Sequence, residues 1–201
     1  MAHTLVFAWP LALAPGAELE APDAVAARDA RLVEAARRDP DAYRHLVNLY
    51  QARVYATALR LLGNESDARD AAQEAFLRGF RALGRFHLGR RFGPWICTIA
   101  ANVAKDQLRD PVRRFLRFGL VRAEGEATGR ASDGVERSER ELRLERALSK
   151  LKPKLREAVV LRFIADLSVE ELADALGIGE SAAKMRVKRG LERLEELLSA
   201  G

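Results

Sequence analysis

The chain of 201 residues is poor in several residue types, and each scarcity excludes a kind of site. A single cysteine, Cys97, leaves no partner for an internal disulfide and rules out a multi-cysteine metal site. The three histidines, His3, His45 and His87, are scattered and form no metal-ligand spacing. No apolar run reaches the length that spans a bilayer. We therefore expect no metal, no cofactor and no direct membrane insertion.

The N-terminal segment lacks the basic residues with which a secretory signal begins. An apolar patch runs from Leu5 to Ala14, but no Lys or Arg precedes it. Pro10, Pro15 and Gly16 interrupt any regular structure there. We expect residues 1–22 to form a disordered or irregular extension and the protein to be cytoplasmic.

Strand-like alternation of apolar and polar residues is also missing, so we expect an all-α protein. Apolar residues instead recur three and four positions apart along several stretches. One runs from Tyr43 to Leu62 and has a stop at Gly63. The next follows a start signal at Asn64, and a third follows Gly93-Pro94, where proline suits the first helical position.

A break in composition divides these helices into two groups. Asp110-Pro111 ends the first group, because the residue before a proline avoids the helical region. Residues 111–137 contain a run rich in Gly, Ala and Ser from Glu124 to Gly134, which predicts a flexible linker whose arginines either stay solvated or contact phosphate or a protein partner. We expect two small helical domains, residues 23–110 and 138–201, joined by this linker.

In the second group, the spacing of Ser168 and Glu171 predicts a capping box, and Gly177 suits the turn of a helix-turn-helix. Cations crowd the first turns of the final helix, where a recognition helix meets the major groove. A solvated basic face would look similar. The net charge of +5 also suggests an anionic partner. The candidate DNA-reading residues are Lys184, Met185, Arg186, Lys188 and Arg189.

In the first group, the helix after Asn64 carries a leucine among polar residues on the side away from its apolar stripe. A leucine there is unusual on a face meant only for water, so we expect a partner to bind this stripe, which consists of Asp70, Gln73, Glu74 and Leu77. The loop that follows interleaves aromatic residues with arginines, and the next helix carries Asn102, Lys105 and Arg109 along one polar stripe. Together these features suit the binding of nucleic acid.

Two parts of the chain resemble a known family. The run from Asp67 to Leu77, with Phe92-Gly-Pro-Trp-Ile96 and Ile99-Ala-Ala-Asn102, resembles the second conserved region of bacterial sigma factors, above all those of the extracytoplasmic-function (ECF) type. The runs Leu144–Leu151, Leu155–Leu161 and Glu171–Ile178 resemble the fourth sigma region, which reads the minus-thirty-five element. Both occur in the family's order with a linker between them.

The resemblance implies a non-enzymatic polymerase subunit that directs promoter recognition and DNA melting. The stripe from Asp70 to Leu77 would dock on the clamp helices of the large subunit of core RNA polymerase. The unpaired minus-ten strand would meet Phe86, Arg90, Arg91, Ile99, Ala100, Asn102, Lys105 and Arg109. Within this set, Phe86 is the candidate for stacking on a base and Asn102 the candidate for reading an extruded one.

The last helix departs from the family's usual recognition pattern. Ala182 and Met185 stand where hydroxyl residues are usual, so one phosphate donor and one base-edge donor are missing. The resemblance further implies promoter DNA, both duplex and unpaired, and an anti-sigma protein as partners.

Two other classes of function compete with this interpretation. A stand-alone helix-turn-helix regulator would need only Leu144 to Leu198 and would leave the stripe from Asp70 to Leu77 unexplained. An enzyme such as a nuclease has no support from a carboxylate cluster, a metal spacing or an activated nucleophile.

Overall fold

The structure, a computed structural model, describes residues 22–110 and 139–199, and every regular element within them is a helix, as the sequence predicts. The first group comprises α1 (Pro22–Arg38), α2 (Tyr43–Leu62), α3 (Glu65–Ala82) and α4 (Phe92–Arg109), with 3-10 turns at Pro40–Ala42 and Leu83–Arg85. The second comprises α6 (Glu139–Ser149), α7 (Pro153–Phe163), α8 (Val169–Leu176) and α9 (Glu180–Ser199). The expectations for residues 1–21 and for the linker lie outside the described residues.

The predicted helix ends show the expected capping geometry. Asn64 accepts a hydrogen bond from the Asp67 amide at 2.9 Å and so caps α3. Ser168 and Glu171 form the reciprocal bonds of the capping box that opens α8. Gly63 and Gly177 end α2 and α8 in the left-handed conformation, at φ +71° and +63°. These boundaries follow from local chemistry alone.

The start of α4 differs by two residues from the prediction. The helix begins at Phe92, so Pro94 occupies its third position rather than its first. Proline is tolerated there because the first amides of a helix have no acceptor within the helix. The amide of Phe92 donates instead to the buried carboxylate of Asp29 in α1, at 2.7 Å.

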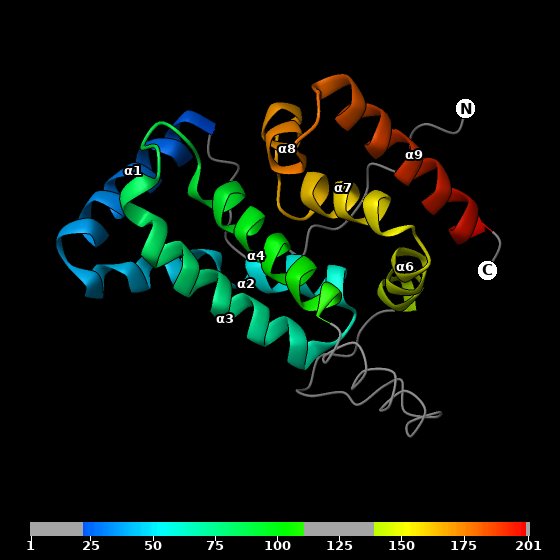
Figure 1. Cartoon of the computed structure of the whole chain (residues 1–201), viewed down its shortest axis with the longest axis horizontal. Helices are drawn as coiled ribbons and strands as arrows, with labels where there is room; N and C mark the ends of the chain where they lie inside the picture. Colours follow the sequence, from blue (N-terminus) through cyan, green and yellow to red (C-terminus); the bar gives the residue numbers. More distant parts are fainter. Residues whose placement is uncertain (1–21, 111–138, 200–201) are drawn as a thin grey trace.

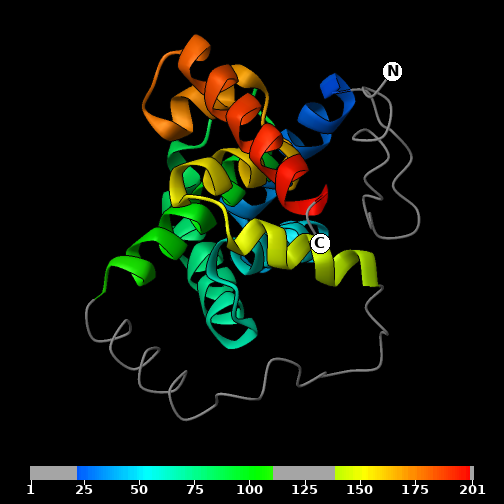
Figure 2. The same cartoon turned by 90° about the vertical axis from the view of Figure 1, so that its right-hand side faces the viewer.

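The two groups of helices pack against each other. In Figures 1 and 2, α7 lies against the first group, where it contacts α2 and α4, while α6 also contacts α2. The buried side chains of Leu161, Leu167 and Leu172 belong to the same hydrophobic core as Val54 and Ile96. By contrast, α3 lies on the side of the first group that faces away from α7, α8 and α9 (Figure 1). The contact between the groups is a feature that the sequence did not predict.

Within the second group, α8 and α9 pack on α7, and a smaller buried cluster joins Leu148, Leu151 and Val159 to Leu194 of α9. Among the described residues, no helix is both long and apolar enough to cross a bilayer.

Candidate polymerase and nucleic-acid interfaces

The predicted partner-binding stripe lies on the outer face of α3. The side chains of Asp70, Gln73 and Leu77 are exposed, and Glu74 is half-buried. Leu77 keeps 47% of its surface accessible, which is high for a leucine in the middle of a long helix. The structure therefore places the four residues together on an accessible face.

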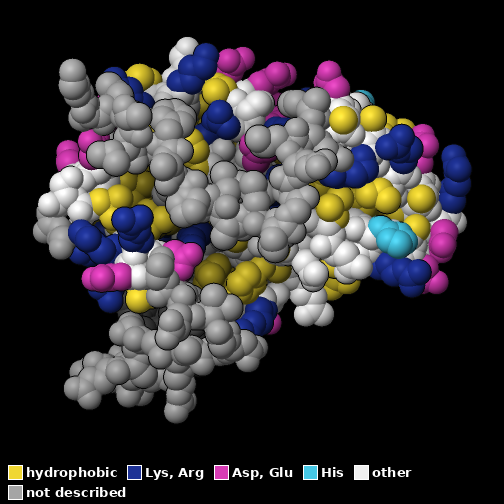
Figure 3. Space-filling view, turned by 180° about the vertical axis from the view of Figure 1, so that it is seen from behind, with side chains coloured by type: hydrophobic (Ala, Val, Ile, Leu, Met, Phe, Trp, Pro, Cys, Tyr) yellow, Lys and Arg dark blue, Asp and Glu magenta, His cyan; other side chains and the backbone are white. Residues whose placement is uncertain are grey.

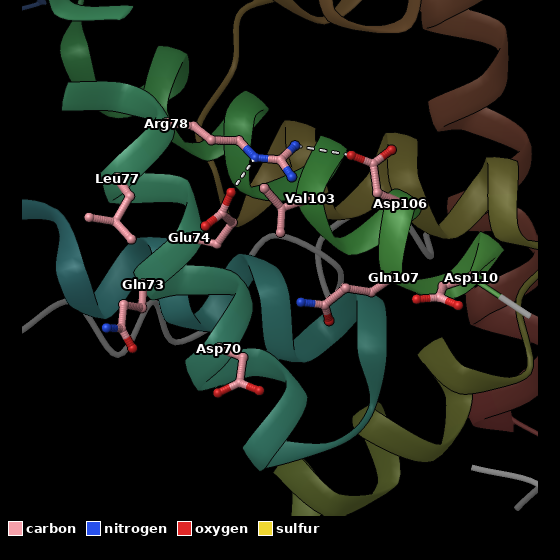
Figure 4. Close-up of a pocket in the computed structure, with 9 residues that line it drawn as sticks. All are labelled: Asp70, Gln73, Glu74, Leu77, Arg78, Val103, Asp106, Gln107 and Asp110. Carbon is pink, nitrogen blue, oxygen red and sulfur yellow. Dashed lines mark hydrogen bonds and ion pairs between the residues drawn. The ribbon is translucent and has the colours of Figure 1, made fainter. Parts of the chain in front are cut away.

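On one side of this stripe, α3 and the C-terminal half of α4 enclose an acidic groove (Figure 4). Arg78 spans it and pairs with Glu74 at 2.7 Å and with Asp106 at 3.0 Å. The hydrogen bonds that Arg78 donates to Glu74 and then to Asp106 raise the pKa of its guanidinium above the ordinary value. Since the groove is lined by four carboxylates but one cation, it suits a cationic partner. Its lining residues are Asp70, Gln73, Glu74, Leu77, Arg78, Val103, Asp106, Gln107 and Asp110.

On the other side, α2 and α3 enclose a groove that is mostly apolar. Tyr43, Val47 and Tyr55 line it from α2, and Phe76 and Phe80 from α3. Gln73 and Leu77 line both grooves and so form the crest between them. Seen from behind, the half of the molecule that carries α1, α2 and α3 exposes hydrophobic side chains among Lys and Arg side chains (Figure 3).

The loop between α3 and α4, predicted to meet an unpaired strand, is held in place by α1. Arg37 donates to the carbonyl oxygen of Leu83 at 2.9 Å and to that of Phe86 at 2.6 Å. Asp29 fixes the far end of the same loop through the amide of Phe92. Sequence reasoning missed both Asp29 and Arg37, although a buried acid within an apolar helix face is a signal that could have revealed Asp29.

Phe86 does not lie where its predicted stacking role requires. Only 4% of its surface is accessible, and its ring packs edge-on against Phe92 at 5.7 Å and Trp95 at 5.1 Å between centroids. In this conformation the loop folds the Phe86 ring into the aromatic core, so a base can stack on it only after the ring moves, and its stacking role stays a prediction. Trp95 remains half-buried beside it.

Along α4, the structure separates the predicted strand-binding residues into two sets. Asn102 and Arg109 are exposed, while Ile99 and Lys105 are half-buried. Ala100 is fully buried, so its contact with DNA stays a prediction and its side chain packs in the core here. Ala100 lies on the side of α4 that faces the core, next to the polar stripe, and contributes packing there.

Three of the predicted cations, two from the loop before α4 and one from α4 itself, contact acids of the second group. Arg91 pairs with Asp166 and with Glu171, each at 2.8 Å. Arg90 lies 3.6 Å from Asp174. Lys105 lies 2.7 Å from the Oε1 atom of the largely buried Glu157.

The predicted helix-turn-helix consists of α8, the turn at Gly177 and α9. The amide of Ile178 donates to the carbonyl oxygen of Ala173, which closes the turn, and Ala183 is fully buried where α9 meets α8. The basic residues at the front of α9 point outward: Lys184, Met185, Lys188 and Arg189 are exposed, and Arg186 is half-buried. Lys184 and Lys188 form only loose pairs with Glu180 and Glu192, at 3.6 and 3.8 Å. Such exposed pairs contribute little, so these cations are available to phosphates.

Comparison with known proteins assigns the two groups of helices. Residues 46–114 match the model of Sigma-70 region 2, and residues 141–194 match that of Sigma-70 region 4. The chain is 31% identical to the ECF RNA polymerase sigma factor SigW of Bacillus subtilis, over 84% of this chain and 95% of the relative. It is 38% identical to the RNA polymerase sigma factor CarQ of Myxococcus xanthus, over 79% and 90%.

Solved structures share the arrangement of helices. The structure of CnrH in complex with the cytosolic domain of CnrY has 28% identity and a TM-score of 0.61, covering 86% of this chain and 97% of CnrH. The sigma factor RpoE of Bartonella quintana, in complex with the anti-sigma factor NepR, has 24% identity and a TM-score of 0.62, over 78% and 96%; at this identity it supports the fold alone.

The two matched regions and the full-length relatives define a class: transcription initiation factors of bacterial RNA polymerase. Within that class, the chain belongs to the sigma-70 family and is a sigma factor of the ECF type. A stand-alone helix-turn-helix regulator is not favoured, because region 2 is present as well. Sigma factors are in general regulatory proteins without catalytic activity.

Proposed function

We propose that this sigma factor docks on core RNA polymerase through the crest that Gln73 and Leu77 form on α3. The observation that carries the proposal is the position of this crest between an acidic groove and an apolar groove. A pair of helices such as the clamp helices could straddle the crest, with cationic side chains beside Asp70 and Glu74 and apolar ones beside Phe80. Leu77 would be the apolar anchor of this interface.

The face beside α4 takes the unpaired minus-ten strand in this proposal. Asn102 offers both donors and an acceptor to the polar edge of an extruded base. Lys105 and Arg109 follow one and two helical turns later, so they would meet the phosphates of the same strand, together with Arg90 and Arg91. Ile99 would line the base pocket, whereas Phe86 and Ala100 support it from the core.

The duplex minus-thirty-five element would lie against the start of α9. The exposure of Lys184, Lys188 and Arg189 supports phosphate contact, and the exposure of Met185 supports an apolar contact with a base edge. Arg186, which is half-buried on the same helix, would contact the DNA backbone beside them.

The remaining features of the protein follow from this role. We propose that residues 23–110 and 138–201 form its two functional domains. In this proposal neither domain has an active site, and the protein works in the cytoplasm. An anti-sigma protein is the expected restraint. This expectation is motivated by the solved structures of similar fold, in which CnrH is bound to the cytosolic domain of CnrY and RpoE is bound to the anti-sigma factor NepR.

Reconstitution tests the proposal. The full chain, mixed with purified core RNA polymerase, should co-elute with core in gel filtration and support run-off transcription from a subset of promoters that core alone does not use. Duplex binding without any association with core would contradict the proposal and restore the stand-alone regulator.

A further inference from the structure

The apolar groove between α2 and α3 is a hydrophobic surface that is open to solvent. Two of its lining side chains, Leu77 and Phe80, keep 47% and 40% of their surface accessible. Among the described residues that line it, Arg69 alone is charged, although charged residues make up 31% of the chain. An exposed apolar patch of this kind marks a site where another apolar surface binds. The groove therefore suits an occupant without charge.

An uncharged apolar stretch of the chain, residues 5–14, lies outside the described residues. Its large side chains fall at every second position and alternate with valine, alanine or proline. The large ones are Leu5, Phe7, Trp9, Leu11 and Leu13. In an extended segment, side chains two positions apart share one face, so these five would all point the same way. Such a segment presents to a groove the uncharged apolar surface that this one requires.

The position of α1 brings this stretch within reach of the groove. Asp29 of α1 accepts from Tyr50 near the middle of α2, and a short connection joins the two helices, so they run antiparallel. The start of α1 at Pro22 therefore lies beside the C-terminal half of α2, which contributes Tyr55 to the groove. Residues 15–21 connect the stretch to Pro22. At about 3.3 Å per residue they span about 23 Å when extended, roughly twice the diameter of a helix.

We propose that residues 5–14 bind in the apolar groove as an extended segment, with their large side chains against Phe76 and Phe80. The segment would cover one flank of the crest, because Gln73 and Leu77 also line this groove. Core RNA polymerase would then have to displace the segment, and its apparent affinity would fall with the fraction of chains whose groove is free. This displacement rests on the proposed function of the crest, whereas the contact of residues 5–14 with the groove does not.

Tryptophan fluorescence tests the contact directly, because the chain has two tryptophans, Trp9 and Trp95. The full-length variant Trp95→Phe leaves Trp9 as the sole emitter. We expect blue-shifted Trp9 emission and a several-fold smaller acrylamide quenching constant than in the same chain unfolded in urea. If Trp95→Phe unfolds the chain, the difference between the spectra of wild type and Trp9→Phe reports the same signal.

A polar substitution in the groove should release the segment. In the Trp95→Phe background, Phe80→Gln changes an exposed lining residue, so the Trp9 emission should move toward that of the unfolded chain. Leu49→Gln is the matched control, since Leu49 is 44% exposed on α2 but lines neither groove, and it should leave the Trp9 emission unchanged. Because the contact is within one chain, the signal should not depend on protein concentration.

A titration of each labelled full-length chain with core RNA polymerase tests the displacement. Phe7→Ser with Leu11→Ser removes two large side chains from the binding face and should raise the affinity for core about three- to tenfold. Val6→Ser with Ala12→Ser makes the same number of polar changes on the opposite face of the segment. This control should bind core like the wild type.

Solvent-like Trp9 emission in the folded Trp95→Phe chain would overturn the proposal, as would equal shifts in the Phe80 and Leu49 variants. Loss of the shielded signal on dilution would also overturn it, because a second copy of the chain would then occupy the groove. Shielded Trp9 with equal core affinity of wild type, segment variant and control would overturn the displacement. Shielded Trp9 with no binding of core by any of these chains would support the contact and contradict the proposed function of the crest.

Discussion

At the scale of single residues, Asp29 holds together the base of the loop between α3 and α4. It is fully buried, and both of its oxygens accept from Tyr50, at 2.6 and 2.7 Å. Burial, and then the neighbouring carboxylate, raise the pKa of Tyr50, so its hydroxyl stays protonated and donates. With the amide of Phe92 as a further donor, this one carboxylate joins α1, α2 and α4.

We predict that Asp29→Ala lowers the free energy of unfolding by about 3 kcal/mol, because it leaves two buried donors without an acceptor. Asp29→Asn should lose less, since the amide oxygen can still accept from Phe92. Urea titration followed by circular dichroism measures both. Asp23→Ala, at an exposed acid in the first turn of α1, is the control and should cost at most about 1 kcal/mol. Similar losses for Asp23→Ala and Asp29→Ala would contradict this role.

Phe86 offers a second test at this scale, because core packing and base stacking predict different results. If the ring is core, Phe86→Leu should cost roughly 1 kcal/mol of stability and leave promoter opening almost intact, whereas Phe86→Ala should cost roughly 3 kcal/mol or more. If the ring instead stacks on a base, Phe86→Leu should reduce promoter opening nearly as much as Phe86→Ala. Potassium permanganate footprinting beside a urea titration separates the two; normal stability with lost opening in Phe86→Leu would contradict the core position.

The positions of these residues show where sequence reasoning succeeded and failed. The caps at Asn64 and Ser168 lie within three residues of their partners, so local chemistry predicted them. Asp29 meets Tyr50 and Phe92, 21 and 63 residues away, and Arg37 meets carbonyl oxygens 46 or more residues away, which no local pattern contains. The rings that bury Phe86 lie only six and nine residues further on, in α4, but the turn of the loop that brings them together leaves no local pattern in the sequence.

At the scale of secondary-structure elements, α3 carries the prediction for polymerase docking. Gln73→Ala with Leu77→Ala should weaken binding to core by about 1–3 kcal/mol without unfolding the chain, because a central apolar anchor is lost. A fluorescence titration of labelled sigma factor with core measures this. Leu49→Ala is a matched control, since Leu49 is 44% exposed on α2 but lines neither groove. Loss of affinity in the Leu49 variant, or none in the double variant, would exclude the crest.

The recognition helix α9 carries the next prediction. Lys188→Ala and Arg189→Ala should each reduce the salt dependence of minus-thirty-five binding by about one unit of log affinity per log salt, as one phosphate contact disappears. The measurement is holoenzyme affinity for a duplex promoter fragment at several salt concentrations. Arg193→Ala removes an exposed cation further along the same helix, beyond the first turns, and should not change the slope. If Lys188→Ala and Arg189→Ala both keep the wild-type slope, α9 does not meet the phosphates.

The stripe on α3 and the basic front of α9 were both predictable, because side chains three and four apart share one face of a helix. The surroundings of α3 were not predictable from the sequence. The acidic groove needs Asp106 and Gln107 of α4, and the apolar groove needs Tyr43 and Tyr55 of α2. The packing of α3 against its neighbours creates both grooves, whereas the spacing of apolar residues describes only one helix at a time.

At the scale of the whole molecule, the sequence predicted two domains and a linker but not their contact. A core shared between helices separated by residues 111–138 depends on matched surfaces, such as Leu167 against the first group, rather than on any motif. The same contact places Arg91 among acids instead of phosphates. A residue can thus be a sound candidate for binding DNA while the structure pairs it within the chain.

The central claim is that this sigma factor opens promoters with Asn102 at the melted strand. Permanganate footprinting of unpaired thymines tests it, with core alone, wild-type holoenzyme and Asn102→Ala holoenzyme on a fully paired promoter and on one that carries a mismatch bubble. Asn48→Ala, at an exposed asparagine of α2, is the control.

We predict no reactive thymines with core alone and clear reactivity with the wild type. Asn102→Ala should open the paired promoter several-fold less, with a smaller deficit on the bubble template, because the mismatch already supplies part of the unpairing energy. The Asn48 variant should match the wild type on both. Equal opening of the paired promoter by Asn102→Ala and wild type would contradict the role of Asn102, and absence of opening by the wild-type holoenzyme would contradict the account as a whole.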